Sequence, residues 1–242
     1  MRVWDVHPGY LSRGNLLGQH AEIHALASIL VEGKKGYRDH PETLRWKDHL
    51  PCLARRHDLT VTEMALRGYR HFSSCPVAEK EHQGPGKGCP GFVDHPAEQF
   101  ELLRVKYRER QAEGRIPLPA RGSQFWAHHK YSVMARGYGY YKEIQAYLKN
   151  NPDLPVREEK ELVERVLKIL EYPAPLGDMV NVMHHLWGYF KREACEEEKE
   201  FYLKKSCEDP HLLLDRFYGM ACKYRKSYLL HSTIFADLLE SV

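Results

Sequence analysis

Residues 15–30 read NLLGQHAEIHALASIL, and this stretch decides the fold class of the first part of the chain. Its apolar residues and one histidine recur three or four positions apart, at Leu16, His20, Ile23, Ala27 and Leu30. That spacing places them on one face of an α-helix. Gly33 follows, and glycine is the residue that most easily ends a helix in the left-handed conformation. The stretch therefore predicts a helix of about four turns.

The rest of the chain carries further helical signals and no sustained period-two alternation typical of a strand. Before residue 73 we expect two more helices, over 41–47 and 51–66. After residue 95 we expect helices near 96–113, 123–149, 157–171, 175–193, 195–206 and 210–240. We therefore predict an all-α fold class with two helical units.

A segment rich in Gly, Pro and Cys interrupts this pattern. Residues 73–95 include SSCP and QGPGKGCPG, and Gly and Pro at that density cannot continue a helix. We therefore predict a helical domain over 1–72, a linker over 73–95 and a second helical domain over 96–242.

The composition of the 242 residues is that of a globular protein, with 43% hydrophobic and 29% charged residues. No apolar run approaches the roughly 18–20 residues that cross a bilayer, and the first residues lack a signal-peptide pattern. We therefore expect a cytoplasmic protein with no membrane partner. The six cysteines show no close pairing, so we expect reduced thiols.

The net charge of +3 comes from the first part of the chain. Residues 1–72 hold eleven Lys or Arg and eight Asp or Glu, whereas the remaining residues hold equal numbers of each sign. The same 72 residues hold seven of the fifteen histidines. This asymmetry indicates an anionic partner for the first part.

The N-terminal amine is a candidate nucleophile. We expect Met1 to be retained, because Arg2 is too large for normal removal of the initiator methionine. An α-amine has a pKa of about 7.7–8.0, against about 10.4 for lysine. Its unprotonated fraction can form a Schiff base with a carbonyl-type carbon.

Glu22 is a candidate for proton transfer, because it lies in the middle of the predicted helix. Its neighbours on the helix surface are Gly18, Ala21 and Ala25, and such small residues leave a shallow floor where a substrate backbone could approach. The alternative is helix packing over the small residues, with Glu22 solvated.

His20 and His24 have the i, i+4 spacing of helical metal ligands. The order H-x-E-x-H differs from the H-E-x-x-H of zinc proteases, and no third ligand is evident. The spacings among Cys52, Cys75 and Cys89 match no zinc or iron–sulfur pattern. We therefore predict no metal site and no cofactor.

Residues 33–39 read GKKGYRD, a basic turn interrupted by one aromatic residue. Lys34, Lys35 and Arg38 in such a turn suit phosphate contacts. A solvated charged turn is the alternative.

The second part combines aromatic residues with Lys and His, in FWAHHKYSVMA from residue 125 and NVMHHLWGYFK from residue 181. Such mixtures can stack bases and hold phosphates, or they can fill a helical core. We expect core positions at Trp126, Met134, Met183, Leu186 and Phe190. A polar cluster is left as a candidate site, formed by His129, Lys130, Asn181, His185 and Lys191.

Ordered segments of residues 1–72 resemble the pyrimidine-dimer DNA glycosylases typified by phage endonuclease V. The chain opens MRVW and continues to HPGYL at residues 7–11, and Glu22 stands at the distance from the chain start where that family has its helical glutamate. GKK at 33–35 and the RD that follows at 38–39 resemble the family's basic turn. Residues 50–69 follow the pattern of its next long helix.

This resemblance implies a mechanism in which the amine of Met1 attacks C1′ of a deoxyribose, displaces the base and forms an imine. Glu22 then assists the proton transfers, and β-elimination breaks the strand. Nucleic-acid contacts are expected from Arg2, His20, His24, Lys34, Lys35 and Arg38. Ala21 and Ala25 stand where the phage enzyme has arginines, which leaves the specificity for dimers open.

Residues 96–242 resemble the all-helical YbgA-type domain of unknown function, which also occurs fused to thiouracil desulfidases. The resemblance rests on His129-Lys130 with Met134-Ala135, and on the run from Asn181 to Lys191. It implies a role linked to nucleic acid without an established chemistry.

Together these observations predict a nucleic-acid enzyme of the DNA glycosylase/AP lyase kind, with DNA as its partner. One alternative is a non-catalytic module that binds RNA, tRNA or modified bases. A second alternative is a metal-dependent hydrolase built on His20 and His24. The sequence predicts no particular oligomeric state.

Overall fold

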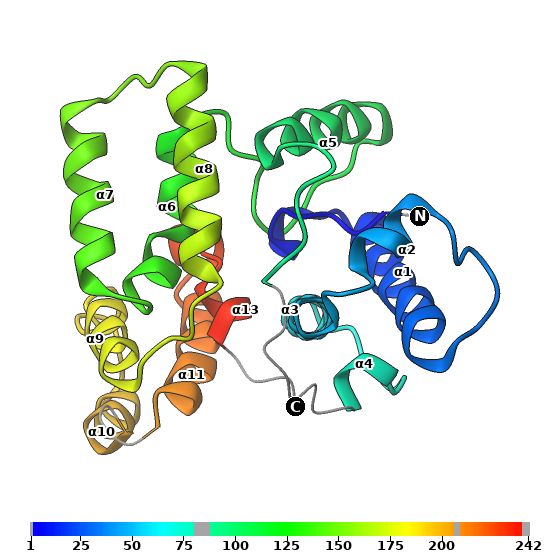
Figure 1. Ribbon diagram of the computed structural model, residues 1–242. Helices are drawn as coiled ribbons and strands as arrows, with labels where there is room; N and C mark the ends of the chain where they lie inside the picture. Colours follow the sequence, from blue (N-terminus) through cyan, green and yellow to red (C-terminus); the bar gives the residue numbers. More distant parts are fainter. Residues whose placement is uncertain (1, 80–87, 206–208, 239–242) are drawn as a thin grey trace. The chain divides into compact units, whose positions relative to one another are not determined.

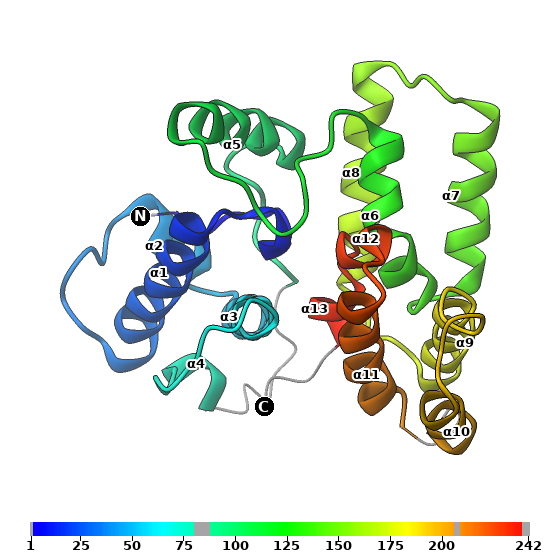
Figure 2. The same cartoon turned by 180° about the vertical axis from the view of Figure 1, so that it is seen from behind.

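The computed structural model describes residues 2–79, 88–205 and 209–238 (Figures 1 and 2). Every regular element within these residues is a helix, which confirms the predicted all-α fold class. None of the helices described is long and apolar enough to pass through a membrane.

The chain divides into two compact units, residues 1–118 and 119–240. This boundary differs from the predicted linker over 73–95. The helix that follows that segment, α5 (Pro96–Arg110), lies in the first unit, where its Gln99 and Tyr107 hydrogen-bond to the N-terminal segment. Glycine and proline mark the end of a helix, but only the contacts of α5 show which core it joins.

The first unit contains a 3-10 turn and five helices among its described residues. They are η1 (Pro8–Tyr10), α1 (Arg13–Glu32), α2 (Pro41–Trp46), α3 (Leu50–Leu66), α4 (Pro76–Glu79) and α5. The helices α1, α3 and α4 pack against one another, and α2 packs against α1 (Figure 1). The three helices predicted before residue 73 are therefore confirmed.

Local signals set the ends of α1 as the sequence predicts. The Ser12 side chain accepts a hydrogen bond from the Asn15 N–H at 3.4 Å, which caps the first turn. Gly33 ends the helix with φ 73°, a left-handed conformation that glycine adopts without strain. One face of the helix then enters the core of the unit, which gathers Val3, Ile23, Leu26, Ala27, Trp46, Cys52, Leu53, Cys75 and Val77.

The second unit is a helical bundle. Its described helices are α6 (Gly122–Met134), α7 (Tyr138–Asn150), α8 (Val156–Leu170), α9 (Leu176–Trp187), α10 (Glu196–Lys205), α11 (Pro210–Lys223), α12 (Ser227–Leu230) and α13 (Ile234–Leu238). The helix α6 packs against α7, α8, α9 and α13, and α11 packs against α9, α10, α12 and α13. The five predicted core residues, Trp126, Met134, Met183, Leu186 and Phe190, are all buried.

Two predicted helices of this unit are interrupted. The expected helix over 123–149 is divided into α6 and α7, because Gly137 takes φ 155° between them. The expected helix over 210–240 is divided into α11, α12 and α13, and Arg225 takes φ 50° at the first break. A residue with positive φ cannot continue a right-handed helix, and periodicity alone does not reveal such a residue.

The expectation that all cysteines are reduced thiols is wrong for one pair. Cys52 on α3 and Cys89 ahead of α5 form a disulfide, with their Cα atoms 5.3 Å apart. Cys75, Cys195 and Cys222 are free. The pairing could not be predicted from spacing, because it requires the segment before α5 to fold back onto α3.

We predict that this disulfide stabilises the first unit. It joins residues 37 positions apart, and closing a loop of that length removes about 4 kcal/mol of unfolded-state entropy at 25 °C. Cys89→Ser is therefore expected to lower the free energy of unfolding by up to about 4 kcal/mol in urea denaturation. Reduction of the wild-type protein should have the same effect, and an equal midpoint before and after reduction would contradict the prediction.

In the second unit, Glu198 of α10 is a buried carboxylate with three donors. It accepts hydrogen bonds from the Tyr224 hydroxyl at 2.6 Å, the Lys223 Nζ at 2.9 Å and the Cys195 backbone N–H at 3.0 Å. Burial alone raises the pKa of Glu198, but these hydrogen bonds outweigh it and lower the pKa to about 2. The folded state therefore stabilises the ionised Glu198 carboxylate more than the unfolded state does.

We predict that this carboxylate makes the second unit sensitive to acid. Its stabilisation is fully present above the unfolded pKa of 4.5 and is lost as the pH falls toward 2. Glu198→Gln should lower the free energy of unfolding at pH 7 by about 1–3 kcal/mol and flatten its pH dependence over that interval. The matched control is Glu197→Gln, an exposed neighbour on the same helix; equal pH profiles for the two variants would refute the assignment.

Candidate active site

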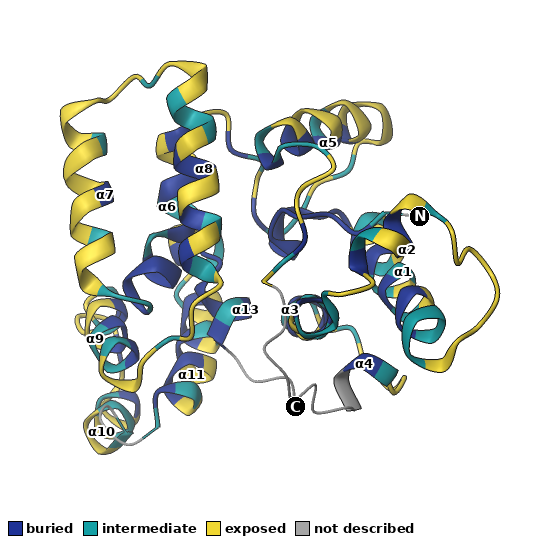
Figure 3. Cartoon of the chain, viewed as in Figure 1, coloured by how far each residue is buried: buried dark blue, intermediate teal, exposed yellow. Residues whose placement is uncertain are grey.

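The N-terminal segment over residues 3–11 runs through the interior of the first unit. All nine residues are buried, and only η1 within them is regular structure (Figure 3). A buried segment without a helix or a strand partner must find other hydrogen-bond partners for its backbone. The surrounding helices supply these partners from side chains, as the following contacts show.

Three helices supply acceptors for successive backbone N–H groups. Val3 donates to Glu42 Oε1 of α2 at 3.1 Å, Trp4 to Gln19 Oε1 of α1 at 2.9 Å and Asp5 to Gln99 Oε1 of α5 at 2.9 Å. Gln19 is itself fixed, because its Nε2 donates to Thr60 Oγ1 at 3.0 Å. The start of the chain is therefore held to three helices at once.

Two arginines, one within α3 and one at its C-terminal end, donate hydrogen bonds to the backbone carbonyls of the segment. The Arg56 guanidinium donates to the carbonyls of Asp5 and Val6, at 3.0 Å each. Arg67 donates to the carbonyls of Pro8, Gly9 and Leu11 at 2.7–3.2 Å. These two positions therefore hold the N-terminal segment in place.

Glu63 completes this arrangement as a fully buried carboxylate. Arg67 Nε donates to its Oε1 at 2.7 Å, and Arg115 NH2 donates to its Oε2 at 2.7 Å. A buried charge is stable only when it is paired in this way. The pairing also orients Arg67 toward the carbonyls that it binds.

The predicted nucleophile, Met1, lies outside the described residues. Arg2, predicted to hold a phosphate, forms an ion pair with Asp94 at 2.8 Å and lies over the Trp4 ring at 4.4 Å. Both side chains of the ion pair are about one third exposed. A phosphate at Arg2 would therefore have to compete with an existing carboxylate partner.

Glu22 is half-buried on α1, and it makes no hydrogen bond or ion pair within the described part of the chain. Its neighbours Gly18, Ala21 and Ala25 are exposed, and Gly18 has no atom within 4 Å of the place that a Cβ would occupy. The small residues beside this carboxylate are therefore open to solvent in the described part of the chain, as the predicted shallow floor requires.

His20 and His24 lie on the other side of α1. At about 100° per residue, Glu22 is about 180° around the helix from the midpoint of the two histidines. Their rings lie instead against His57 of α3 and His71. The ring centroid of each α1 histidine is 4.9–6.0 Å from the centroids of His57 and His71. The two histidines grouped with the DNA-binding residues therefore do not join Glu22.

The four histidines strongly affect one another's charge. Burial and the neighbouring imidazoles lower the pKa of His20 to about 4. Burial likewise opposes protonation of His57, but its hydrogen bond to Asp58 and the nearby Cys75 thiol raise its pKa to about 9. The pKa values of His24 and His71 are lowered, first by burial. At neutral pH His20 is therefore neutral and His57 is protonated.

Sequence reasoning did not find His57 and His71 as partners of the α1 histidines. His57 is separated from His20 by 37 residues, and His71 lies outside any helix. The one available signal is the concentration of histidines in residues 1–72.

The predicted basic turn forms an exposed loop between α1 and α2. Lys34, Lys35 and Arg38 are all exposed, and Lys34 pairs with Glu32 at 2.8 Å. Tyr37 in the same loop is 72% exposed. The loop therefore presents cations and one aromatic ring to the solvent.

In the second unit, the five residues of the predicted polar cluster do not form one site. His129 is fully buried, where its Nδ1 lies 3.3 Å from Thr233 Oγ1, and burial holds its pKa well below the usual value. Asn181 is half-buried, and His185 and Lys191 are exposed. Within the described residues no hydrogen bond or ion pair connects any two of the five.

Lys130 lies in a tyrosine cluster instead. Its Nζ is 4.7 Å from the ring centroid of Tyr131 and 4.9 Å from that of Tyr228. Tyr131 shares a hydrogen bond of 2.8 Å with Tyr189, whose ring stacks on Tyr228. Burial lowers the pKa of Lys130, and the aromatic faces stabilise its charged form.

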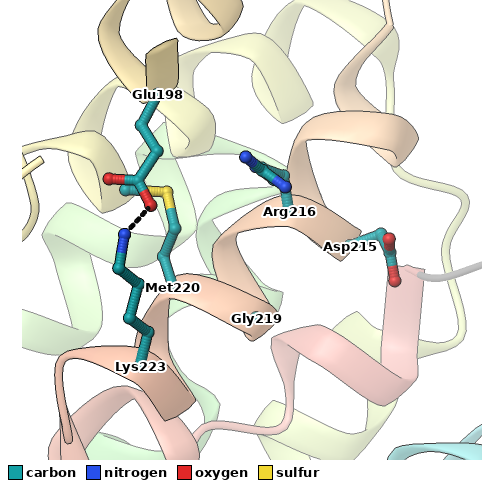
Figure 4. A pocket seen from close by; sticks show the side chains of 6 residues that line it. All are labelled: Glu198, Asp215, Arg216, Gly219, Met220 and Lys223. Carbon is teal, nitrogen blue, oxygen red and sulfur yellow. Dashed lines mark hydrogen bonds and ion pairs between the residues drawn. The ribbon is translucent and has the colours of Figure 1, made fainter. Parts of the chain in front are cut away.

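A separate pocket of about 370 Å³ is formed by α10 and α11 (Figure 4). Its lining residues are Glu198, Asp215, Arg216, Gly219, Met220 and Lys223. None of them was predicted to bind a ligand. The dashed ion pair between Glu198 and Lys223 in Figure 4 is part of the stabilising contact described above.

Comparison with known families agrees with the two sequence resemblances. Residues 1–77 match the family model of pyrimidine dimer DNA glycosylases. Residues 130–237 match a family of proteins of unknown function, DUF1722, which corresponds to the YbgA-type domain. Searches of curated proteins and of solved structures found no match. The chain therefore combines a region similar to the pyrimidine dimer DNA glycosylases with a region similar to the DUF1722 proteins.

We predict that Gln19 is required to hold the N-terminal segment. Gln19→Leu removes the acceptor of the buried Trp4 N–H, which should cost about 1–3 kcal/mol in the free energy of unfolding. Hydrogen exchange of the Trp4 amide should accelerate in this variant, while exchange of the Leu53 amide within α3 stays slow. Unchanged protection of Trp4 would show that the segment is held without Gln19.

Proposed function

We propose that the glycosylase-like domain, residues 1–77, cleaves damaged DNA as a glycosylase/AP lyase. In this proposal the α-amine of Met1 is the nucleophile and Glu22 is the acid–base residue. The observation that carries the proposal is the anchoring of the N-terminal segment beside α1, within a domain that matches the glycosylase family.

The anchored segment supports this assignment through the covalent reach of the chain. Two residues separate the α-amine from the Val3 nitrogen, and two residues span at most about 7 Å, so the amine can act only near Val3. Trp4 is held to Gln19, which lies one turn before Glu22 on α1. The fixed chain start and the Glu22 carboxylate, which no described residue pairs with, therefore belong to the same part of the first unit.

The proposed reaction begins when the unprotonated amine attacks C1′ of a deoxyribose. The C1′–base bond breaks as the C1′–nitrogen bond forms, and the departing base takes a proton. Opening of the sugar gives an imine, loss of a C2′ proton follows, and the 3′ phosphate leaves by β-elimination. Glu22 can accept and return these protons, because no described residue holds its carboxylate.

The exposed loop over residues 34–38 supplies candidate DNA contacts. Lys35 and Arg38 can bind phosphates, and the exposed ring of Tyr37 can stack on a base or a sugar. The target nucleotide would have to leave the helical stack to reach the amine.

The DUF1722 domain is proposed to help select or hold the nucleic acid. The observation behind this role is the cluster of Lys130 with Tyr131, Tyr189 and Tyr228, which combines a cation with aromatic faces. Stronger binding of RNA than of DNA, without strand cleavage, would instead favour a non-catalytic RNA-binding module.

The central test is borohydride trapping on DNA that contains abasic sites or pyrimidine dimers. The wild-type protein should form a covalent adduct, because borohydride reduces the imine to a stable amine. Glu22→Gln should slow strand cleavage by about 10²–10⁴-fold. Glu113→Gln, an exposed carboxylate change in the same unit, is the control and should cleave at the wild-type rate.

An N-terminal acetyl group or a short N-terminal extension provides the decisive comparison. Either change removes or displaces the amine without altering any described residue, so the adduct should disappear. An adduct that forms equally well with a blocked N-terminus would overturn the proposed nucleophile.

The salt dependence of DNA binding tests the basic loop. Replacing Lys35 and Arg38 together by alanine should reduce the slope of log K against log salt by about 1.8, because each phosphate contact contributes about 0.9. Lys34→Ala should change the slope less, because Glu32 already partly neutralises Lys34. An unchanged slope in the double variant would remove the loop from the DNA interface.

A further inference from the structure

Four histidines of the first unit converge on one point. His20 and His24 come from successive turns of α1, His57 comes from α3, and His71 lies in the segment that follows α3. Each offers a ring nitrogen, and the four nitrogens all lie within 4.8 Å of one another. Nε2 of His20 and Nε2 of His24 are 3.0 Å apart.

Two of these histidines each have a buried ring nitrogen without a partner among the described residues. His57 is only 4% exposed, and neither its Nε2 nor the Nε2 of His71 has a hydrogen-bond partner in the described part of the chain. A buried polar atom without a partner costs about 1–3 kcal/mol. Two such atoms beside two further imidazoles therefore indicate a ligand that all four can bind.

Asp58 orients one of the four rings. Its Oδ1 lies 3.0 Å from Nδ1 of His57, so the Nδ1–H donates to the carboxylate, and Nε2 can bind a metal ion once it gives up its proton. Metal-binding histidines commonly have this arrangement, in which a carboxylate fixes the ring and raises the basicity of the other nitrogen.

We propose that His20, His24, His57 and His71 bind a divalent first-row transition-metal ion, with Zn²⁺ as the best fit. Imidazole nitrogens select such ions over Mg²⁺ and Ca²⁺, which take oxygen ligands. With Zn–N bonds of about 2.0–2.1 Å, a tetrahedral site needs ligand nitrogens about 3.3 Å apart. Nε2 of His20 and Nε2 of His24 are already 3.0 Å apart, and the four nitrogens lie within 4.8 Å of one another, which is close to that spacing.

The site is structural in kind. Four protein ligands fill a tetrahedral zinc ion, whereas a catalytic zinc keeps one position open for water or substrate. The ion would join α1, α3 and the segment at His71 on the side of α1 opposite Glu22. The inference goes beyond the proposed lyase function and does not rest on it, because no ligand of the site belongs to that chemistry.

The test uses the untagged full-length protein after removal of metal by a chelator and dialysis. Titration with ZnCl₂ should show one tight site per chain by calorimetry and elemental analysis, and should raise the unfolding temperature. X-ray absorption of the zinc-loaded protein should give about four nitrogen neighbours at about 2.0 Å. Co²⁺ in place of Zn²⁺ should give the intense visible bands of a tetrahedral ion.

Variants assign the binding to this cluster. His71→Ala is the main variant, because His71 is half-exposed outside any helix and its loss should leave the fold intact. It should weaken Zn²⁺ binding at least 100-fold. Asp58→Asn should weaken it about 10–100-fold through the lost orientation of His57.

Two controls separate this site from other zinc binding and from the lyase. His185→Ala removes an exposed histidine of the second unit, and Glu22→Gln changes the opposite side of α1; both should bind one Zn²⁺ as the wild type does. The proposal is overturned if the wild type binds no stoichiometric Zn²⁺, or if His71→Ala binds it as tightly. If zinc binding is intact but no covalent adduct forms in the borohydride experiment, the proposed lyase function is contradicted and the proposed metal site is not.

Discussion

The first unit depends on burying a chain segment that has almost no regular structure. Residues 3–11 lie in the interior, where each backbone N–H and C=O needs a partner that water cannot provide. The partners are side chains of α1, α2, α3 and α5, and Arg67 alone binds three carbonyls. Any one of these helices can shift only if it breaks hydrogen bonds to the segment, so the start of the chain holds the helices together.

The helix α3 shows how several kinds of contact reinforce this arrangement. Arg56 holds the N-terminal segment, Cys52 forms the disulfide with Cys89, and His57 belongs to the histidine cluster. Cys52 and Arg56 lie one turn apart on the same face of the helix, His57 lies about 100° further round, and the three contacts reach different parts of the unit. Hydrogen bonds, a covalent bond and the proposed metal site therefore act on one central element.

The two sides of α1 carry different chemistry. Its buried face supplies the core and Gln19, one flank presents Glu22 above exposed small residues, and the other flank presents His20 and His24 toward α3. A helix can serve both flanks because residues two positions apart point in nearly opposite directions. The proposed lyase site and the proposed metal site are thus separated by the width of one helix and can be tested independently.

Periodicity determined the helices over 15–30, 41–47 and 51–66, the five core residues of the second unit and the exposed floor beside Glu22, because these features depend on residues three or four positions apart. The motifs near the chain start also sufficed to indicate the glycosylase family that residues 1–77 match.

Tertiary structure alone decided that α5 joins the first unit, that Cys52 pairs with Cys89 and that His57 and His71 meet the histidines of α1. It also separated His129 from Lys130, whose side chains enter a core and a tyrosine cluster. The physical reason is that these contacts join residues far apart in the sequence or depend on which neighbouring helix a side chain meets. Only the packing of whole helices brings such groups together.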